Sequence, residues 1–590
     1  MRAARVRANR VERAFGRAVQ LLRPHDLGGL LRLASRLSAF EVWTPHNDSL
    51  SVFPLWNFQR SRSLADLILA SGAEYQERPL VLTGEDWRGV VNACGDIADD
   101  PELFASVEAV DGTDAVYREF RRAMTRLGAT QLWEQDPGSF ETGGRMAAMW
   151  EVLAVTRRNR IPENQLAFVE SVRPGVKSTL LGVPISELVM ALRDVLIYFS
   201  LFNLKSHRFL SWWSPPLPSR DDADVGRVRR QMVVLSYLQR DDWHLKGDLE
   251  FSAQRLVDVV RGVHEKLGRT RQPRAVEIER LEALLTLTAR SVAEMREMLR
   301  TDPVYSRGSR ASRLSPLERF PAVRLGELEP PRYVIPNIRH FNKGVPAILE
   351  FILQSALGRD YQHARGALLH VYVWELLEQI LPRLVIIPET AYRARGERKL
   401  SADLTVVDTH AKRIIGIEVK GRGIRLDTRL TMSDEDLDAN FKDALSALRG
   451  LPQKIADVRT GLPEFREWQD AIGSTGDSPP ILVAITREGL HLLSSLFQER
   501  ERTAQSEQTA NLGRFPSCLI SVAVFERAVE VAAREGRSLA SLLEGHWERA
   551  NSRDMSNADA DQFGPFVRGS IRDSFATRFL PAEYYSREDD

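Results

Sequence analysis

The chain contains 590 residues, of which 43% are hydrophobic and 27% are charged, and its formal net charge at pH 7 is +1. A chain of this length is expected to form about three to four domains, each able to bury an apolar core, which excludes a disordered protein and a disulfide-stapled scaffold. Its two cysteines, Cys94 and Cys518, indicate a reducing compartment and are too few for a four-cysteine zinc site.

The first 25 residues hold seven arginines and one acid, Glu12, and lack the apolar core of a secretory signal. This pattern favours a basic surface helix, with a mitochondrial transit peptide as the alternative. The most apolar helical stretch, residues 188–204, contains Arg193 and Asp194, whose charges would be costly in lipid. We therefore expect a protein without membrane spans, located in the cytoplasm.

Most of residues 1–300 have the apolar spacing of helices. The clearest stretches are 15–33, 146–155, 188–201, 228–238 and 276–299. We therefore expect a large α-helical accessory region. Six prolines lie between residues 303 and 336, and such a density stops regular helix, so residues 301–345 are predicted to be a linker.

After the predicted linker, the apolar pattern changes from mainly helical to a mixture of helices and strands. A helix at 365–381 precedes strand-like runs, and further helices separate the later ones. The strands are expected at 383–388, 401–407, 414–420, 480–486 and 518–525, and the helices at 437–459, 488–499 and 526–535. Residues 346–548 are therefore predicted to form an α/β domain with a small mixed sheet, and residues 549–590 a polar tail. The fold class is mixed.

The most informative segment is a predicted hairpin at residues 400–422. If its loop is 409–412, Asp408 pairs with Arg413, and residue numbers in the antiparallel pair keep a constant sum. Asp403 then lies opposite Glu418. Strand alternation places Lys420 on the same face as Glu418.

Two carboxylates on directly opposed positions of neighbouring strands repel each other unless a cation intervenes, and their oxygens suit Mg²⁺ or Mn²⁺. A lysine beside them can orient or deprotonate a water, or offset charge on a phosphate. Together these groups predict metal-assisted phosphodiester hydrolysis. The alternative is a solvated strand face, which the apolar run 414–419 and the scarcity of lysine, ten residues in the chain, make less favourable.

An aspartate, a hairpin and then Glu418-Val-Lys420 resemble the core motif of the PD-(D/E)XK nuclease superfamily. That family's fold is a helix, three strands, a helix and a further strand, so the resemblance implies a restriction-endonuclease-like domain over residues 346–548. It implies that Asp403, Glu418 and Lys420 are the catalytic residues. Asp403 and Glu418 would bind the metal ion, and Lys420 would be the catalytic lysine.

The helix before the strands resembles the first motif of the family, in which a glycine is followed four residues later by an acid. This chain has His370 at the acid position, as RecB-type members do, which implies that His370 is a third metal ligand. A histidine packed in an amphipathic helix is the alternative. Glu375 is the backup ligand, although it lies about 140° further round the helix, so the two side chains are not expected to share one metal.

Two positions depart from the family pattern. Ala402 replaces the proline before Asp403, and Gln453 is followed by Asp457 where RecB-type members carry Gln-x-x-x-Tyr. Four residues are candidates for contact with nucleic-acid phosphates, against the alternatives of ordinary loop arginines and a plain surface helix. They are Arg422, Arg425, Gln453 and Lys454.

The resemblance implies a Mg²⁺- or Mn²⁺-dependent deoxyribonuclease, and the sequence itself does not separate DNA from RNA as the substrate. By analogy, we expect an endonuclease effector of bacterial defence, restriction or repair, whose N-terminal region recognises a partner protein or a DNA feature. Relatives that act in pairs on a duplex suggest a homodimer. Two alternatives stay open: a nucleic-acid-binding module that does not cleave, and a scaffold or sensor subunit.

Overall fold

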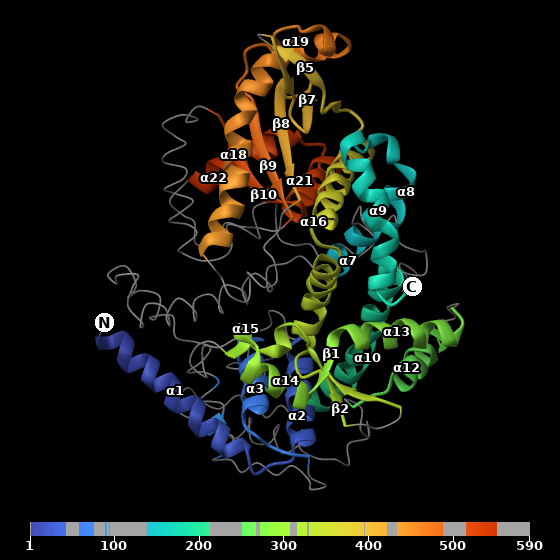
Figure 1. Ribbon diagram of the computed structural model, residues 1–590, viewed down its shortest axis with the longest axis vertical. Coiled ribbons are helices and arrows are strands. Elements are labelled where there is room, and N and C mark those ends of the chain that lie inside the picture. The colour runs from blue at the N-terminus through green and yellow to red at the C-terminus, as the bar shows by residue number, and fades with distance from the viewer. Residues whose placement is uncertain are drawn as a thin grey trace. The chain divides into compact units, whose positions relative to one another are not determined.

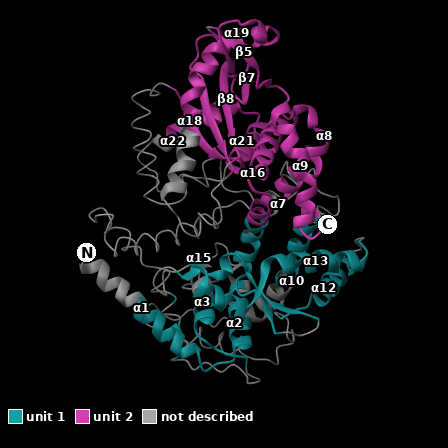
Figure 2. Ribbon diagram, in the orientation of Figure 1, with its two compact units in different colours: residues 1–134, 187–349 teal, residues 135–186, 350–590 magenta. Residues whose placement is uncertain are grey.

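The computed structural model describes residues 2–42, 58–75, 86, 89–90, 94, 139–212, 250–266, 272–306, 315–326, 330–394, 396–421, 434–487 and 515–551. Contacts divide the chain into two compact units, each built from two stretches of sequence (Figure 2). Unit 1 contains residues 1–134 and 187–349, and unit 2 contains residues 135–186 and 350–590.

Unit 1 is mainly helical, as predicted. Its described helices are α1 (Arg2–Leu22), α2 (Leu27–Val42), α3 (Phe58–Ala70), most of α10 (Ile185–Trp212), α12 (Ala253–Lys266), α13 (Arg274–Thr288), α14 (Val292–Thr301) and α15 (Pro303–Ser306). Buried apolar side chains of α1, α2 and α3 form one core with side chains of α14 and of a small sheet. In the described part of the chain, no helix is both long enough and apolar enough to cross a membrane.

The predicted linker is wrong, because part of the proline-rich stretch belongs to the fold of unit 1. Strands β1 (Ala289–Ser291), β2 (Ala322–Leu325) and β3 (Arg332–Val334) form a sheet in that order, with β1 and β2 parallel and β3 antiparallel. Pro321 and Pro331 stand just before β2 and β3, where a missing N–H interrupts little of the ladder. Strands of three and four residues are too short for their periodicity to be read from the sequence.

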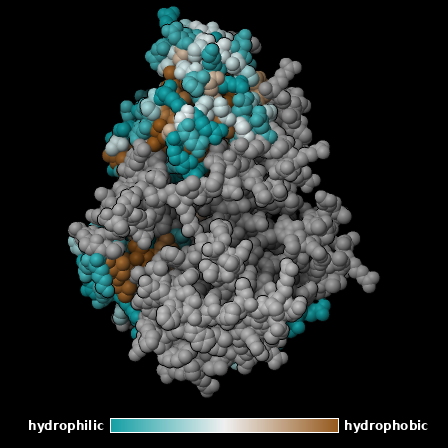
Figure 3. Space-filling view, turned by 180° about the vertical axis from the view of Figure 1, so that it is seen from behind, coloured by the Kyte–Doolittle hydropathy of each residue, from teal (hydrophilic) through white to brown (hydrophobic). Residues whose placement is uncertain are grey.

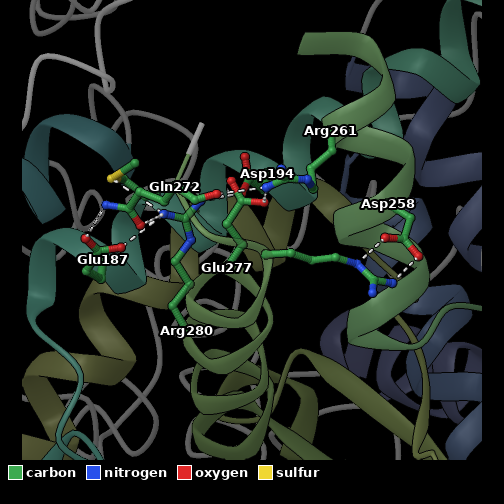
Figure 4. A network of polar contacts seen from close by, with 9 residues as sticks. Glu187, Asp194, Asp258, Arg261, Gln272, Glu277 and Arg280 are labelled. Carbon is green, nitrogen blue, oxygen red and sulfur yellow. Dashed lines mark hydrogen bonds and ion pairs between the residues drawn. The ribbon is translucent and has the colours of Figure 1, made fainter. Parts of the chain in front are cut away.

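A polar network joins three helices of unit 1 (Figure 4). Arg280 of α13, with a side chain only 2% exposed, binds Glu187 and Asp194 of α10 at 3.0 and 2.7 Å. Arg261 of α12 reaches Glu277 of α13 at 2.9 Å. The carboxylate of Asp194, within the apolar stretch of α10, is thus paired with Arg280 inside the protein, as a buried carboxylate requires.

Unit 2 contains the predicted α/β domain (Figure 1). Its helical elements are α7 (Ser139–Ala147), the π-helix η2 (Ala148–Leu153), α8 (Ala154–Thr156), η3 (Arg158–Arg160), α9 (Glu163–Thr179), the second part of α16 (Ile338–Ile380), α18 (Asp434–Arg459), η6 (Pro463–Trp468), α19 (Gln469–Gly473), α21 (Val522–Arg534) and α22 (Leu539–Asn551). Gly358, with φ of 64°, kinks α16 into two helices.

Five strands form the main sheet of unit 2 in the order β10-β9-β8-β7-β4. They are β4 (Val385–Pro388), β7 (Leu404–Asp408), β8 (Arg413–Lys420), β9 (Ile481–Thr486) and β10 (Ser517–Ser521). The first three are antiparallel, whereas β8, β9 and β10 are parallel. A separate hairpin of β5 (Ala391–Ala394) and β6 (Glu397–Leu400) is inserted between β4 and β7. The predicted order of a helix, three core strands, a helix and a further strand is present.

Helix α18 lies against one face of this sheet, and α22 lies against the other. Leu451 and Ile455 of α18 pack over Gly416 of β8. On the other face, the Ser538 hydroxyl just before α22 donates to Asp408 at the end of β7, at 2.8 Å. Helices on both faces explain why β8 and β9 are apolar almost throughout.

Two sequence predictions need correction in unit 2. The strand predicted at 518–525 ends at Ser521, whose hydroxyl accepts a hydrogen bond from Val524 N–H and caps α21, so the apolar residues 522–525 are helical. Residues 139–179, predicted as part of the N-terminal region, contact the α/β domain. The buried Arg145 side chain binds Glu526, with two hydrogen bonds of 2.8 and 2.7 Å. The predicted helix 488–499 and residues 552–590 of the tail lie outside the described residues.

Exposed apolar side chains are few among the described residues. The surface seen in Figure 3 mixes hydrophilic and hydrophobic residues. The large apolar side chains with the greatest exposure are Tyr75, Val155, Leu181, Val259, Val276 and Leu400. Exposed apolar side chains are common on protein surfaces and by themselves indicate no particular ligand.

Candidate active site

The predicted hairpin and its register are confirmed. Asp408 lies opposite Arg413, and Leu404 lies opposite Ile417. One further step in the same register places Asp403, just before β7, opposite Glu418. The main-chain N–H of Val419 donates to Asp403 Oδ2 at 2.7 Å, which fixes the aspartate at the start of the strand.

A third carboxylate, which the sequence reasoning missed, continues this row. Pro388 of β4 pairs with Leu404 of β7, so Glu389 is the next residue opposite Asp403. Two contacts between Thr390 and Ser401 close the base of the inserted hairpin: Ser401 N–H donates to Thr390 O at 3.0 Å, and Thr390 N–H donates to Ser401 Oγ at 2.8 Å. Glu389 and Asp403 flank this base. One sequence feature could have indicated Glu389: it stands directly before residues 390–402, and Asp403 stands directly after them.

The row of carboxylates lies on the face of the sheet that α18 covers. Glu418 and Lys420 share this face with Gly416, because side chains alternate along a strand. A Cβ atom at Gly416 would lie 2.6 Å from Ile455 Cδ1, so the glycine allows α18 to approach β8 closely. This approach brings Lys454 of α18 to the site.

Two lysines bind the Glu418 carboxylate. Lys420 Nζ lies 2.8 Å from Oε2, and Lys454 Nζ lies 2.6 Å from Oε1. The Glu418 side chain is 5% exposed, whereas those of Lys420 and Lys454 are 33% and 29% exposed. A nearly buried carboxylate thus faces two cations that solvent can still reach. Lys454, predicted as a contact for nucleic acid, is part of the same charge cluster as the motif residues.

The other two acids, Asp403 and Glu389, have raised pKa values. Burial and the nearby Glu418 carboxylate raise the pKa of Asp403 above its ordinary value, against the opposing charge of Lys420. Burial and the nearby Asp403 likewise raise the pKa of Glu389. Ionised carboxylates so placed favour an added cation or proton, which is the behaviour expected of a metal or acid–base site.

His370 lies beside this site, on the part of α16 that precedes β4. Its Nε2 is 2.9 Å from the main-chain oxygen of Asp403, a geometry in which Nε2 carries the proton and donates. In this arrangement Nε2 does not ligate a metal ion and instead holds the main chain of Asp403 in place. The role of metal ligand implied by the resemblance remains a prediction.

Two glycines bring α16 and the end of β8 together. A Cβ atom at Gly421 would lie 2.5 Å from Gly366 Cα, so the two main chains are almost in contact. Arg365 strengthens this contact by donating to Gly421 O at 2.6 Å. The glycine of the first motif therefore lies directly against the residue that follows Lys420.

The backup ligand, Glu375, lies elsewhere. Its side chain is 1% exposed and binds Arg157 at 2.6 Å and Arg160 at 2.8 Å. Gln379 donates to its second oxygen at 2.7 Å. These contacts make Glu375 a buried structural acid that attaches the segment around η3 to α16.

The other residues predicted to contact nucleic acid are Gln453, Arg422 and Arg425. Gln453 Nε2 donates to Asp457 at 2.7 Å, and the Tyr392 hydroxyl donates to the other oxygen of Asp457 at 2.8 Å. Gln453 thus takes part in packing between α18 and the inserted hairpin. Arg422 and Arg425 lie outside the described residues.

The chemistry of the donor set fits a small, hard divalent cation. Among the described residues, no group of three or more His, Cys, Asp or Glu side chains is arranged to hold a metal ion. Mg²⁺, however, commonly binds through one or two carboxylates and completes its shell with waters and substrate phosphate oxygens. Asp403 and Glu418 supply such a pair.

Three comparisons with known proteins found no match: no family model, no curated protein and no solved structure matches the chain. Its function therefore has to be argued from the geometry and chemistry of the site itself.

Proposed function

We propose that this protein is a Mg²⁺- or Mn²⁺-dependent nuclease that hydrolyses phosphodiester bonds in DNA. The observation that carries the proposal is the placement of Asp403 and Glu418 on adjacent strands with Lys420 bound to Glu418 at 2.8 Å. Two carboxylates and a lysine on one strand face are the groups that metal-assisted phosphodiester hydrolysis needs.

The order and pairing of the elements support membership of the PD-(D/E)XK nuclease superfamily. Helix α16 is followed by three antiparallel strands, β4, β7 and β8, then by α18 and by β9, which is parallel to β8. The motif residues stand at the start of β7 and at the end of β8. The hairpin inserted between β4 and β7 does not interrupt the pairing of these strands.

In this proposal, Asp403 and Glu418 hold the divalent cation. The cation supplies polarisation of the phosphate and a lower pKa for the attacking water. Lys420 orients that water or neutralises charge on the phosphate as the bond breaks. His370 keeps the Asp403 main chain fixed, so that the aspartate stays opposite Glu418.

A second candidate function has its own support. Both oxygens of Glu418 are bound by ammonium groups, which gives a site neutralised by the protein's own cations. A nucleic-acid-binding module that keeps the fold without cleavage would have such a site. The two functions differ in one respect: only the nuclease requires an added divalent cation.

The wider role that we propose is an endonuclease effector of bacterial defence, restriction or repair, with unit 1 serving recognition of a partner protein or a DNA feature. DNA is favoured over RNA because most proteins with this motif cut DNA. A homodimer would place two sites on one duplex.

The test is cleavage of supercoiled and linear DNA by the full chain in Mg²⁺, Mn²⁺ or EDTA. Wild type is compared with Asp403→Ala and Lys420→Ala, and with Lys177→Ala, an exposed lysine of α9, as the control. We expect metal-dependent cutting that both site variants lose and the control keeps. Cutting of the supercoiled but not the linear substrate would indicate an endonuclease. Binding of DNA without cutting in either metal would favour the second function.

A further inference from the structure

Lys454 has a position that its sequence neighbourhood does not explain. It comes from α18, 36 positions from Glu418, yet its Nζ lies 2.6 Å from Glu418 Oε1. Lys420, which belongs to the same strand as Glu418, already binds Oε2 at 2.8 Å. A single lysine satisfies the charge of one glutamate, so the second ammonium group needs a reason.

The placement of Lys454 is fixed by packing. Its neighbours Leu451 and Ile455 are fully buried against the sheet, and Gly416 lets them come close to β8. The Lys454 side chain itself is 29% exposed. The helix is thus held firmly, while the ammonium group stands at the end of a flexible four-carbon chain that reaches solvent.

A divalent cation and these two ammonium groups cannot all occupy the same carboxylate. An ion that takes Glu418 as a ligand needs one of its oxygens, and that oxygen must give up its ammonium group. Lys420 is tethered two residues away on the same strand, on the face of Glu418. Lys454 approaches from the opposing helix and can swing out without a main-chain movement.

We propose that Lys454 is an exchangeable counter-ion of Glu418: it occupies the carboxylate when no metal ion is bound, and metal binding releases its ammonium group to contact the substrate phosphate. This inference rests on the proposed nuclease function and adds a residue to it. The two states keep Glu418 neutralised throughout. The released cation stays tethered beside the site, where an ammonium group is a suitable partner for a phosphate oxygen.

The first test is a calorimetric titration of the full chain with Mn²⁺ alone, which measures the affinity for the metal ion. Lys454→Met keeps the length and apolar stem of the lysine and removes its charge. Because the competing cation is gone, we expect Mn²⁺ to bind at least about tenfold more tightly than to wild type. Lys454→Arg keeps the positive charge and should bind Mn²⁺ within about threefold of wild type. Lys177→Met, at an exposed position of α9, is the matched control and should not differ from wild type.

The second test is DNA cleavage at saturating Mn²⁺. Lys454→Met should be slower than wild type by about tenfold or more, because its phosphate contact is missing. Tighter metal binding combined with slower cleavage is the signature of exchange. A lysine that only holds Glu418 in position would instead give weaker metal binding, and this result would overturn the proposal. Tighter binding with unchanged cleavage would overturn the contact with phosphate.

Failure of this inference can be told from failure of the nuclease proposal. A wild-type protein that neither binds Mn²⁺ nor cleaves DNA overturns both. A wild-type protein that binds Mn²⁺, with Lys454→Met equal to it, overturns the exchange alone. If Lys454→Met does not fold, as judged by circular dichroism, the same comparison on Lys454→Gln decides the matter.

Discussion

Alanine at Gly421 and alanine at Gly366 should have opposite effects on stability, although these two glycines lie against each other. At Gly421 the new Cβ would be 2.5 Å from Gly366 Cα and 3.1 Å from Gly366 N. These are main-chain atoms, which cannot rotate away. A Cβ at Gly366 would meet nothing within 4 Å.

The magnitudes follow from these contacts. An ordinary carbon contact needs about 1 Å more than Gly421→Ala provides, so α16 or the end of β8 must move, at a cost of about 1–3 kcal/mol for overpacking. The movement also weakens the hydrogen bond from Arg365 to Gly421 O, adding roughly 1 kcal/mol. Gly366 lies inside a helix, where alanine is favoured over glycine by about 0.8–1 kcal/mol.

The assay is calorimetric unfolding of the full chain, because the two units can unfold in separate transitions. The transition of unit 2 should fall by about 4–8 °C in Gly421→Ala and rise by about 2 °C in Gly366→Ala. Gly421→Ala should also lower DNA cleavage, since residue 421 follows Lys420 directly. Equal changes of the same sign in the two variants would refute the close approach of α16 and β8.

Three further predictions concern the carboxylates and the helix above them. Asp403→Asn keeps a side-chain oxygen for the hydrogen bond from Val419 N–H but removes the carboxylate, so it should abolish Mn²⁺ binding. Because burial and Glu418 raise the pKa of that carboxyl, its removal should stabilise the protein at pH 7 by about 1 kcal/mol. This advantage is fully present once wild-type Asp403 is ionised, above its raised folded-state pKa. It should vanish below about pH 3, where the carboxyl is protonated in both the folded and the unfolded state. Unfolding at pH 3 and pH 7 measures the difference, and an equal advantage at both would contradict the assignment. Glu389→Gln should shift the acid limb of cleavage to lower pH, because removing its negative charge favours ionisation of Asp403; an unchanged pH–rate profile would mean that Glu389 does not act on Asp403. Gly416→Ala should cost no more than about 1 kcal/mol in urea unfolding, because its nearest contact is the flexible end of Ile455, and a loss as large as that of Gly421→Ala would show that α18 cannot adjust.

The hairpin that carries the motif could be predicted because its determinants are local. Apolar runs flank a polar stretch, and this pattern fixes both strands and their register. The pairing of Asp408 with Arg413 then carries over to every later pair. The order of the core elements was predictable for the same reason, since each strand and helix of this domain has its own apolar pattern.

Glu389 and Lys454 could not be located in this way, because nothing local places them. Between Glu389 and Asp403 stands a separate hairpin, so no constant sum of residue numbers links them until that insertion is recognised. Lys454 reaches Glu418 from another element through the packing of α18 on the sheet. Only its position beside Gln453 suggested a role, and that suggestion was contact with nucleic acid.

The domain boundaries failed for a related reason. Arg145 and Glu526 are 381 positions apart, and their buried ion pair attaches residues 139–179 to the α/β domain. The amphipathic pattern of α7 reports that one face is buried, without identifying the surface that covers it. The density of proline in residues 301–345 predicts a linker, whereas Pro321 and Pro331 mark where short strands begin.

Glu350 and Asp403, two acids of the same unit, differ in how the surrounding protein treats their charge. Both are strongly desolvated, which by itself raises the pKa of each. Arg365 and Arg487 reverse that effect at Glu350 and hold its pKa below the ordinary value. Glu350 also accepts a hydrogen bond from the Tyr361 hydroxyl at 2.9 Å. This acid is fully used by the fold.

At Asp403 no such reversal occurs. The nearby carboxylate of Glu418 raises its pKa further, and the cation that could offset the charge, Lys420, is bound to Glu418 at 2.8 Å. The Asp403 side chain accepts a hydrogen bond from Val419 N–H, which the side-chain oxygen of an asparagine would accept without the repulsion. A desolvated aspartate beside another carboxylate costs stability, and both lysines of the site are bound to Glu418 rather than to Asp403, which is the arrangement expected where a cation is supplied from outside. The uncompensated charge at Asp403 therefore fits the proposed metal-dependent nuclease better than a module that only binds nucleic acid.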